Sequence, residues 1–176
     1  MTPSLQEPSD PPELSRPIDL RQILAKPVKV EASEAERKAL ARRFALVRID
    51  RLEAEAALEA DGDAVVAKGR LRAAIVQSCA ISGEDLPVTI DEPLALRFVP
   101  EAPVTEAEIE LDESKLDEIP FAGTAFDLGE AVAQSLALAI DPYAVGPEAE
   151  RVRKEAGLLD EAASGPFAAL AALRKS

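Results

Sequence analysis

The stretch VVAKGRLRAAIVQ, residues 65–77, decides the fold of this chain. Its odd-numbered positions up to Ile75 are apolar or glycine, whereas its three basic residues, Lys68, Arg70 and Arg72, all hold even positions. This period of two is the pattern of a β-strand with one buried side and one solvent-facing side. We therefore expect a strand over residues 65–77.

Extended segments lie on both sides of this strand. After it, Ser82-Gly83-Glu84-Asp85 is typical of a chain reversal, and residues 88–99 are again extended, with Pro93 marking a bulge or a sheet edge. Before it, Asp61-Gly62-Asp63 has the composition of a tight turn. The turn predicts a hairpin between residues 46–58 and the central strand.

The run from residue 46 to residue 58 allows two interpretations. Its apolar residues alternate with charged ones, but their parity slips between Ile49 and Leu52, which indicates a β-bulge within a strand. Its alanines, leucines and glutamates also have high helix propensity. The tight turn that follows favours the strand.

Two further segments carry helix signals. Ser33 and Glu36 form a capping-box sequence at the start of one expected helix. Asp127, followed three positions later by Glu130, is expected to cap a second helix whose apolar face covers the sheet. With a short strand over residues 28–31, these elements predict an α+β fold: an antiparallel β-meander, strongly curved or barrel-like, packed by two or three helices.

Composition sets the expected domain boundaries. Residues 1–14 are polar and rich in proline, so a flexible leader is expected there. Residues 15–145 are expected to form a single α+β domain. Residues 146–176 are interrupted by proline and glycine, which predicts a loosely attached C-terminal tail.

Composition also disfavours several classes of function. The 176 residues include no histidine, one cysteine and 3% aromatic residues, so the usual general base, the commonest zinc ligand, an internal disulfide and a stacking platform for single-stranded RNA are missing. Nucleotide-binding glycine motifs and a nucleophile elbow are also absent. We therefore expect no enzyme activity and no cofactor.

No apolar run is long enough to cross a bilayer, which predicts a soluble, cytoplasmic protein without a membrane partner.

Two charged segments are candidates for partner binding. Basic residues at helical spacing in the first expected helix suit nucleic acid or an acidic partner, although a solvated face balanced by Glu34 and Glu36 is the simpler interpretation. These candidates are Arg37, Lys38, Arg42 and Arg43. The net charge is −13, and residues 101–150 contain one Lys or Arg against thirteen Asp or Glu, which suits a basic partner. The candidates in that region are Glu106, Glu108, Glu110, Asp112 and Glu113.

Short motifs along the chain occur together in one order. They are Ser15-Arg16-Pro17, Glu34-Ala35-Glu36-Arg37 with the helix to Phe44, Gly69-Arg70-Leu71 leading to Gln77-Ser78-Cys79, Asp91-Glu92-Pro93-Leu94 leading to Phe98-Val99-Pro100, Phe126-Asp127-Leu128-Gly129-Glu130, Leu136-Ala137-Leu138-Ala139 before Asp141-Pro142-Tyr143, and Pro166-Phe167-Ala168-Ala169-Leu170. In this combination the chain resembles the YceD-like family of large ribosomal RNA subunit accumulation proteins, in the form typical of alphaproteobacteria.

The resemblance implies a non-enzymatic role in ribosome biogenesis, in which the protein supports the synthesis or accumulation of large-subunit ribosomal RNA. The implied partner is a ribosomal RNA precursor or a basic ribosomal protein. Two alternatives stay open: an acidic module that holds a basic ribosomal protein, and a small enzyme or ligand-binding module that uses carboxylates on an open sheet face. Prolines 17, 27 and 93 would protect sheet edges, so a monomer is expected.

The lone cysteine lies where the resemblance implies a degenerate motif. Many family members have Cys-x-x-Cys at this strand end and a further cysteine pair near the C-terminus, whereas here Cys79 is followed by Ser82 and the tail has no cysteine. A tetrahedral zinc site therefore cannot be assembled within one chain. Because Glu84 and Asp85 would raise the pKa of the Cys79 thiol, a buried and unreactive side chain is expected.

Overall fold

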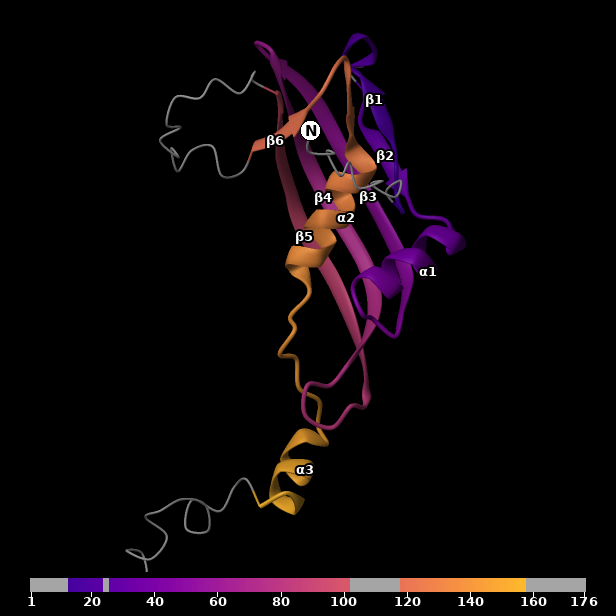
Figure 1. The fold of residues 1–176 in the computed structure, drawn as a ribbon, viewed down its shortest axis with the longest axis vertical. Coiled ribbons are helices and arrows are strands. Elements are labelled where there is room, and N and C mark those ends of the chain that lie inside the picture. Colours follow the sequence, from indigo (N-terminus) through magenta and orange to yellow (C-terminus); the bar gives the residue numbers. More distant parts are fainter. Residues whose placement is uncertain (1–12, 24–25, 102–117, 158–176) are drawn as a thin grey trace, which may run out of the picture.

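The computed structural model describes residues 13–23, 26–101 and 118–157, which form a long sheet with helices packed against it (Figure 1). The strands of the main sheet lie in the spatial order β2-β3-β4-β5-β6. Their bounds are β2 Val28–Glu31, β3 Arg48–Asp61, β4 Ala64–Ser78, β5 Asp85–Pro100 and β6 Glu118–Phe121. The first four strands are antiparallel neighbours, which confirms the predicted meander and the α+β class.

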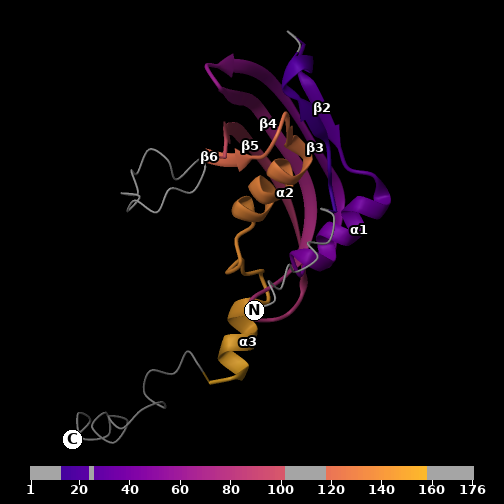
Figure 2. The same cartoon turned by 45° about the horizontal axis from the view of Figure 1, so that its top comes forward.

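The main sheet is strongly curved and open. The long strands β3, β4 and β5 bend along their length (Figures 1 and 2). β2 and β6 lie at opposite ends of the strand order, so the described strands do not close into a barrel. β6 pairs with the end of β5 in parallel, over Arg97–Pro100. The sheet is thus antiparallel except at this edge, where a long connection lets the chain return in the direction of β5.

Strand β4 has the alternation that its sequence predicts. Its inward side chains Val65, Ala67, Leu71, Ala73 and Ile75 are at most 2% exposed. The basic residues of opposite parity are exposed on the outer face. Burial of the apolar face removes most of its area from water, and this burial is the main driving force for the sheet.

The flanking strands confirm the hairpin and the bulge. The register between β3 and β4 shifts between Ile49 and Arg51, where the bulge is predicted. The helical interpretation of residues 46–58 is wrong, because pairing with β2 and β4 outweighs local propensity. The register between β4 and β5 is continuous through Pro93, so this proline marks no bulge. It lies instead in the part of β5 that β6 does not cover, which confirms the edge interpretation.

The described residues also contain three α-helices: α1 Glu34–Arg43, α2 Leu128–Ala139 and α3 Ala149–Glu155. The capping box of α1 is confirmed by both of its hydrogen bonds between Ser33 and Glu36. Helix α2 crosses the concave face of the sheet and is capped by Asp127, whose carboxylate accepts from the Glu130 N–H at 3.1 Å (Figure 2). The Glu130 carboxylate does not accept from the Asp127 N–H, as a complete capping box would require, because it binds Arg43 instead.

Residues 13–23, which precede β2, cross the start of α2, and we refer to them as the strap. Strand β1 Pro17–Asp19 pairs with β7 Ala125–Asp127 in a second, two-stranded sheet, and the 3-10 helix η1 Leu20–Gln22 follows. A Cβ on Gly129 would lie 2.7 Å from the Arg16 nitrogen, so only glycine permits this approach. Leu14 is fully buried, so the expected flexible leader does not extend this far; residues 1–12 lie outside the described residues.

The strap is joined to α1 through Arg16. Its guanidinium donates to both Glu36 oxygens, at 2.7 and 3.1 Å, and to the Glu31 carbonyl at 2.9 Å. The Ser33 N–H also donates to the Glu36 carboxylate at 2.7 Å. These bonds, with that of Arg16 first, lower the pKa of Glu36 to about 2.

This depressed pKa predicts a pH-dependent stability. Glu36→Gln should lower the free energy of unfolding by about 1–2 kcal/mol at neutral pH, because the charged carboxylate is favoured in the folded state. The stabilisation is present above the ordinary carboxyl pKa of 4.5 and is lost as the pH falls toward 2. Urea unfolding of both proteins across this range measures the difference. Glu34→Gln is the control: its exposed pair with Lys38 should contribute little at any pH. If the free energies of unfolding of the wild type and Glu36→Gln differed by the same amount at every pH, the depressed pKa of Glu36 would be contradicted.

The chain after α2 packs along the β4–β5 turn. The Gln77 side chain donates to the Asp141 carbonyl at 2.7 Å, and the Ala80 N–H donates to the Ala144 carbonyl at 3.0 Å. Ala149 at the start of α3 is 2% exposed. Residues 146–149 of the expected tail thus contact the β4–β5 turn, whereas residues 158–176 lie outside the described residues. The division into leader, domain and tail as a whole stays a prediction.

Candidate functional site

A hollow between α1 and the start of β3 brings together three of the four predicted basic residues. It has a volume of about 500 Å³. Arg37, Lys38 and Arg42 line it from the helix, and Arg48 lines it from the strand. A short turn places the two elements side by side, because the Leu46 N–H donates to the Ala41 carbonyl at 2.8 Å. Sequence reasoning missed Arg48, because only the turn brings it beside the helix. We refer to this surface as the α1–β3 hollow.

The cations of the α1–β3 hollow are incompletely neutralised. Lys38 pairs with Glu34 at 2.6 Å and Arg48 with Asp50 at 3.0 Å, and both pairs are exposed. Arg42 makes no ion pair with any described residue. Exposed pairs contribute little and exchange readily, so a phosphate group can replace the glutamate and aspartate as the partner of these cations.

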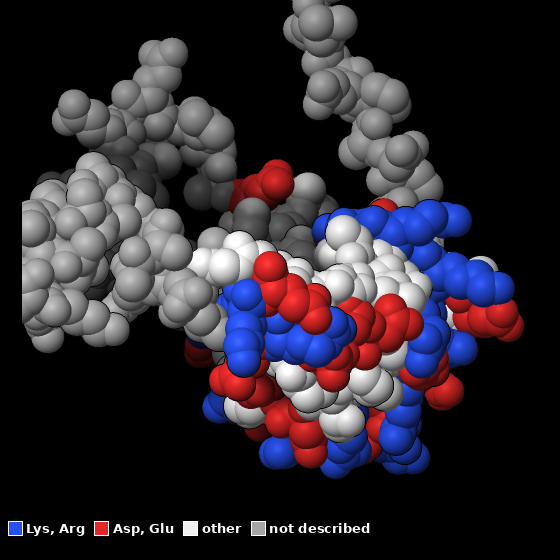
Figure 3. All heavy atoms as spheres, turned by 90° about the horizontal axis from the view of Figure 1, so that it is seen from below, with Lys and Arg blue, Asp and Glu red and all other residues white. Residues whose placement is uncertain are grey.

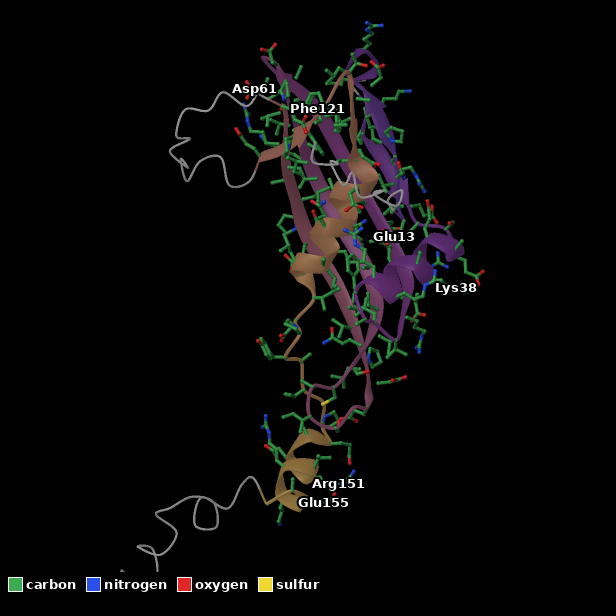
Figure 4. All side chains as sticks on the ribbon, viewed as in Figure 1. Glu13, Lys38, Asp61, Phe121, Arg151 and Glu155 are labelled. Carbon is green, nitrogen blue, oxygen red and sulfur yellow. The ribbon has the colours of Figure 1, made fainter. Side chains whose placement is uncertain are left out.

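Arg43, the fourth predicted residue, points away from the hollow. Its guanidinium donates to both Glu130 oxygens, at 2.9 and 2.8 Å, and to Glu13 at 2.9 Å. Glu13 lies between α1 and α2 (Figure 4). The bond to Glu130, followed by the bond to Glu13, raises the pKa of Arg43 above its ordinary value. Arg43 therefore joins the two helices and the strap within the domain.

The predicted acidic site is not described by the structure. Glu106, Glu108, Glu110, Asp112 and Glu113 lie outside the described residues. At the end of the molecule where α3 lies, basic and acidic side chains alternate over the surface (Figure 3). Arg151 and Glu155 on α3, which lie 2.8 Å apart, are one such pair (Figure 4). The net charge alone therefore does not locate a binding surface.

Cys79 lies in a turn that directs backbone N–H groups at its sulfur. Ser82 and Gly146 donate to Sγ at 3.3 Å each, and Ile81 donates at 3.5 Å. The side chain is 4% exposed, as predicted. Hydrogen bonds from Ser82, followed by the one from the Gly146 N–H, lower the pKa of Cys79 to about 6. The expected rise in this pKa is wrong, because these donors outweigh the nearby carboxylates and one of them comes from a distant part of the chain.

The Cys79 turn lacks the partners that a metal requires. Ser82 lies three positions after Cys79, and its hydroxyl donates to Glu84 at 3.0 Å. Within residues 13–23, 26–101 and 118–157, no group of three or more cysteine, aspartate or glutamate side chains is placed to hold a metal ion. The hydrogen bonds to Sγ therefore stabilise a thiolate by backbone donors.

A titration of the thiol tests this geometry. The ultraviolet absorbance of the thiolate should rise with a midpoint near pH 6, about 2–3 units below an ordinary cysteine. Ser82→Ala should move the midpoint upward, because Ser82 is the largest contributor to the lowered pKa. Titration near the ordinary value in the folded wild-type chain would contradict the arrangement.

These features define a small α+β protein with an open curved sheet, a cation-lined hollow and a cysteine-centred turn. A family model described as large ribosomal RNA subunit accumulation protein YceD matches residues 67–174, more than half of the chain. The chain belongs to this family. The comparisons with curated proteins and with solved structures gave no match.

The family match covers the Cys79 turn and begins within β4, so α1 and its hollow precede the matched residues. The family's description connects this chain with the accumulation of the large ribosomal RNA subunit and names no catalytic activity. None of the helices in the described part of the chain is both long and apolar enough to cross a membrane.

Proposed function

We propose that this protein supports the accumulation of large-subunit ribosomal RNA by binding the phosphate backbone of the RNA precursor in the α1–β3 hollow. The observation that supports this most is the meeting of four cations from two elements in one hollow. Two of them, Arg37 and Arg42, make no ion pair with a described residue. We further propose that the protein acts in the cytoplasm, without catalysis of its own.

The physics of phosphate recognition favours a local site of this kind. Affinity for nucleic acid rests on Lys and Arg contacts that release counterions. Over the rest of the surface, the net charge of −13 opposes non-specific binding, so attraction is confined to places where cations outnumber acids. In the α1–β3 hollow four cations meet two carboxylates, those of Glu34 and Asp50. The exposed Val47 beside them offers an apolar contact to a sugar or base.

Charge reversal at Arg42 tests the proposal. Arg42→Glu should weaken binding to a large-subunit ribosomal RNA transcript by roughly 5- to 10-fold at about 0.1 M salt, because it replaces a phosphate contact by a repulsion. The slope of affinity against salt should also fall by about 0.7–0.9. Filter binding across a salt series measures both quantities.

Lys68→Glu is the matched control. Lys68 is exposed on the outer face of β4, lies outside the hollow, and makes no ion pair with a described residue. Lys68→Glu changes the net charge by the same amount as Arg42→Glu and should leave the affinity for RNA within about 2-fold of the wild-type value. In cells, only Arg42→Glu should lower large-subunit ribosomal RNA. Equal losses for both variants would show that net charge, rather than this hollow, controls RNA binding.

A further inference from the structure

A groove on the opposite side of the molecule runs between α2 and the edge of β5. Its volume is about 730 Å³. Leu71 and Leu94 lie at its base, Ile119 and Leu138 at its sides, and Glu92 and Glu118 beside them. β5 lies next to α2 in both views of the fold, and β6 covers only its last residues (Figures 1 and 2). We refer to this surface as the α2–β5 groove.

Leu138, which lines the α2–β5 groove, is exposed, and two further exposed apolar side chains follow it along the chain. Among the described residues four large apolar side chains are exposed, and three of them lie within residues 138–145. Leu138 is 89% exposed, Tyr143 81% and Val145 52%. A soluble chain seldom clusters such side chains without a partner for them. Leu138 therefore offers an exposed apolar contact to a partner in the groove.

Both charged side chains that line the groove, Glu92 and Glu118, are acidic. From Glu118 to Glu150 the chain contains six Asp or Glu residues and no Lys or Arg. Glu92 makes no ion pair with a described residue, and Glu118 reaches only Arg97, at 3.4 Å, which Asp61 also binds. Apolar area rimmed by carboxylates complements a segment that is apolar on one face and basic on the other.

Neither RNA nor a second copy of the chain suits this surface. Phosphates would meet carboxylates, and a second copy would bring acidic rims together. The β5 edge also pairs poorly with another strand. The Glu101 N–H points away from β4, toward the Phe121 carbonyl. Pro87 and Pro93 are an even number of residues from Glu101 in a continuous register, so their backbone nitrogens also face away from β4. Because proline has no N–H, this edge lacks a hydrogen-bond donor at both positions.

We propose that the α2–β5 groove docks a basic amphipathic segment of a partner protein, with its apolar face on Leu138 and the groove base and its cations on Glu92 and Glu118. This site is separate from the α1–β3 hollow, so the chain holds a protein on one side and RNA on the other.

Leu138→Glu separates apolar docking from simple charge attraction. The probe is a labelled synthetic peptide of leucine and lysine with helical amphipathic spacing, titrated with the full chain by fluorescence anisotropy. The substitution adds a negative charge, so attraction by charge alone predicts unchanged or tighter binding. Docking in the groove predicts binding about 10-fold weaker, because an apolar contact is lost. Leu138 is so exposed that folding should be unaffected, which circular dichroism checks.

Val47→Glu is the matched control, since Val47 is also an exposed large apolar residue and lies in the α1–β3 hollow. It should leave peptide binding within about 2-fold. Hydrogen exchange should show protection of residues 89–96 and 134–139 by the peptide. Any of three results would overturn the proposal. They are unchanged or tighter peptide binding by Leu138→Glu, protection of the groove in a peptide-free dimer, and protection of the groove by RNA. Leu138→Glu should not alter RNA binding and Arg42→Glu should not weaken peptide binding, so failure of one proposal leaves the other standing.

Discussion

Gly69→Ala should lower the free energy of unfolding by about 3–4 kcal/mol, a large part of the stability of a domain this size. Gly69 lies opposite Ala56 in the β3–β4 pairing, at the middle of the curved strands. A Cβ at this position would lie 1.8 Å from the Glu55 carbonyl oxygen and 2.7 Å from the Ala56 Cα. Both atoms belong to the backbone, so the strands themselves would have to separate.

Urea unfolding followed by circular dichroism measures this effect, and Gly83→Ala is the matched control. Gly83 has a positive φ of 72°, but its added Cβ would meet nothing within 4 Å. The control should cost only the strain of the backbone conformation, about 1 kcal/mol. If Gly69→Ala were no more destabilising than Gly83→Ala, the close approach of β3 to β4 at this residue would be wrong.

Leu14→Ala should cost about 3 kcal/mol, although it lies near the start of the described chain. The side chain is fully buried, and the strap that carries it passes under Gly129 at the start of α2. Its truncation leaves a cavity between the strap and α2, which the rigid contact at Gly129 prevents from closing. The loss therefore includes both the burial of the leucine and the cavity.

Leu138→Ala is the control for Leu14→Ala, because the same truncation at an 89% exposed side chain should cost about 0.5 kcal/mol or less. Thermal unfolding of the two variants compares them directly. Equal small effects would mean that the strap is loosely attached, as the composition of residues 1–14 predicts. A large effect at Leu14 alone would show that the folded domain begins before residue 15.

Elements that depend on neighbouring residues were predictable. The period of two in β4, the bulge between Ile49 and Leu52 and the caps at Ser33 and Asp127 were all read from a few adjacent positions. Each is set by interactions within one turn or one hairpin, so the sequence contains its own evidence.

The candidate site was only partly predictable. Arg37, Lys38 and Arg42 share a helix face that the spacing shows, whereas Arg48 joins them only after α1 folds onto β3. Arg43 has the same local sequence character, yet Glu130 and Glu13 bind it on the other side. No spacing within α1 distinguishes Arg43 from its neighbours, because its partners lie in other elements.

The sequence by itself determined the meander, its inward face and both long helices, because the alternation of apolar residues and the caps act locally. Only the tertiary structure decided the parallel β6, the buried Leu14 and the Gly146 N–H that meets the Cys79 sulfur. These features join residues far apart in the chain, and their free energy comes from burial and hydrogen bonds that exist only once the sheet and α2 have packed together.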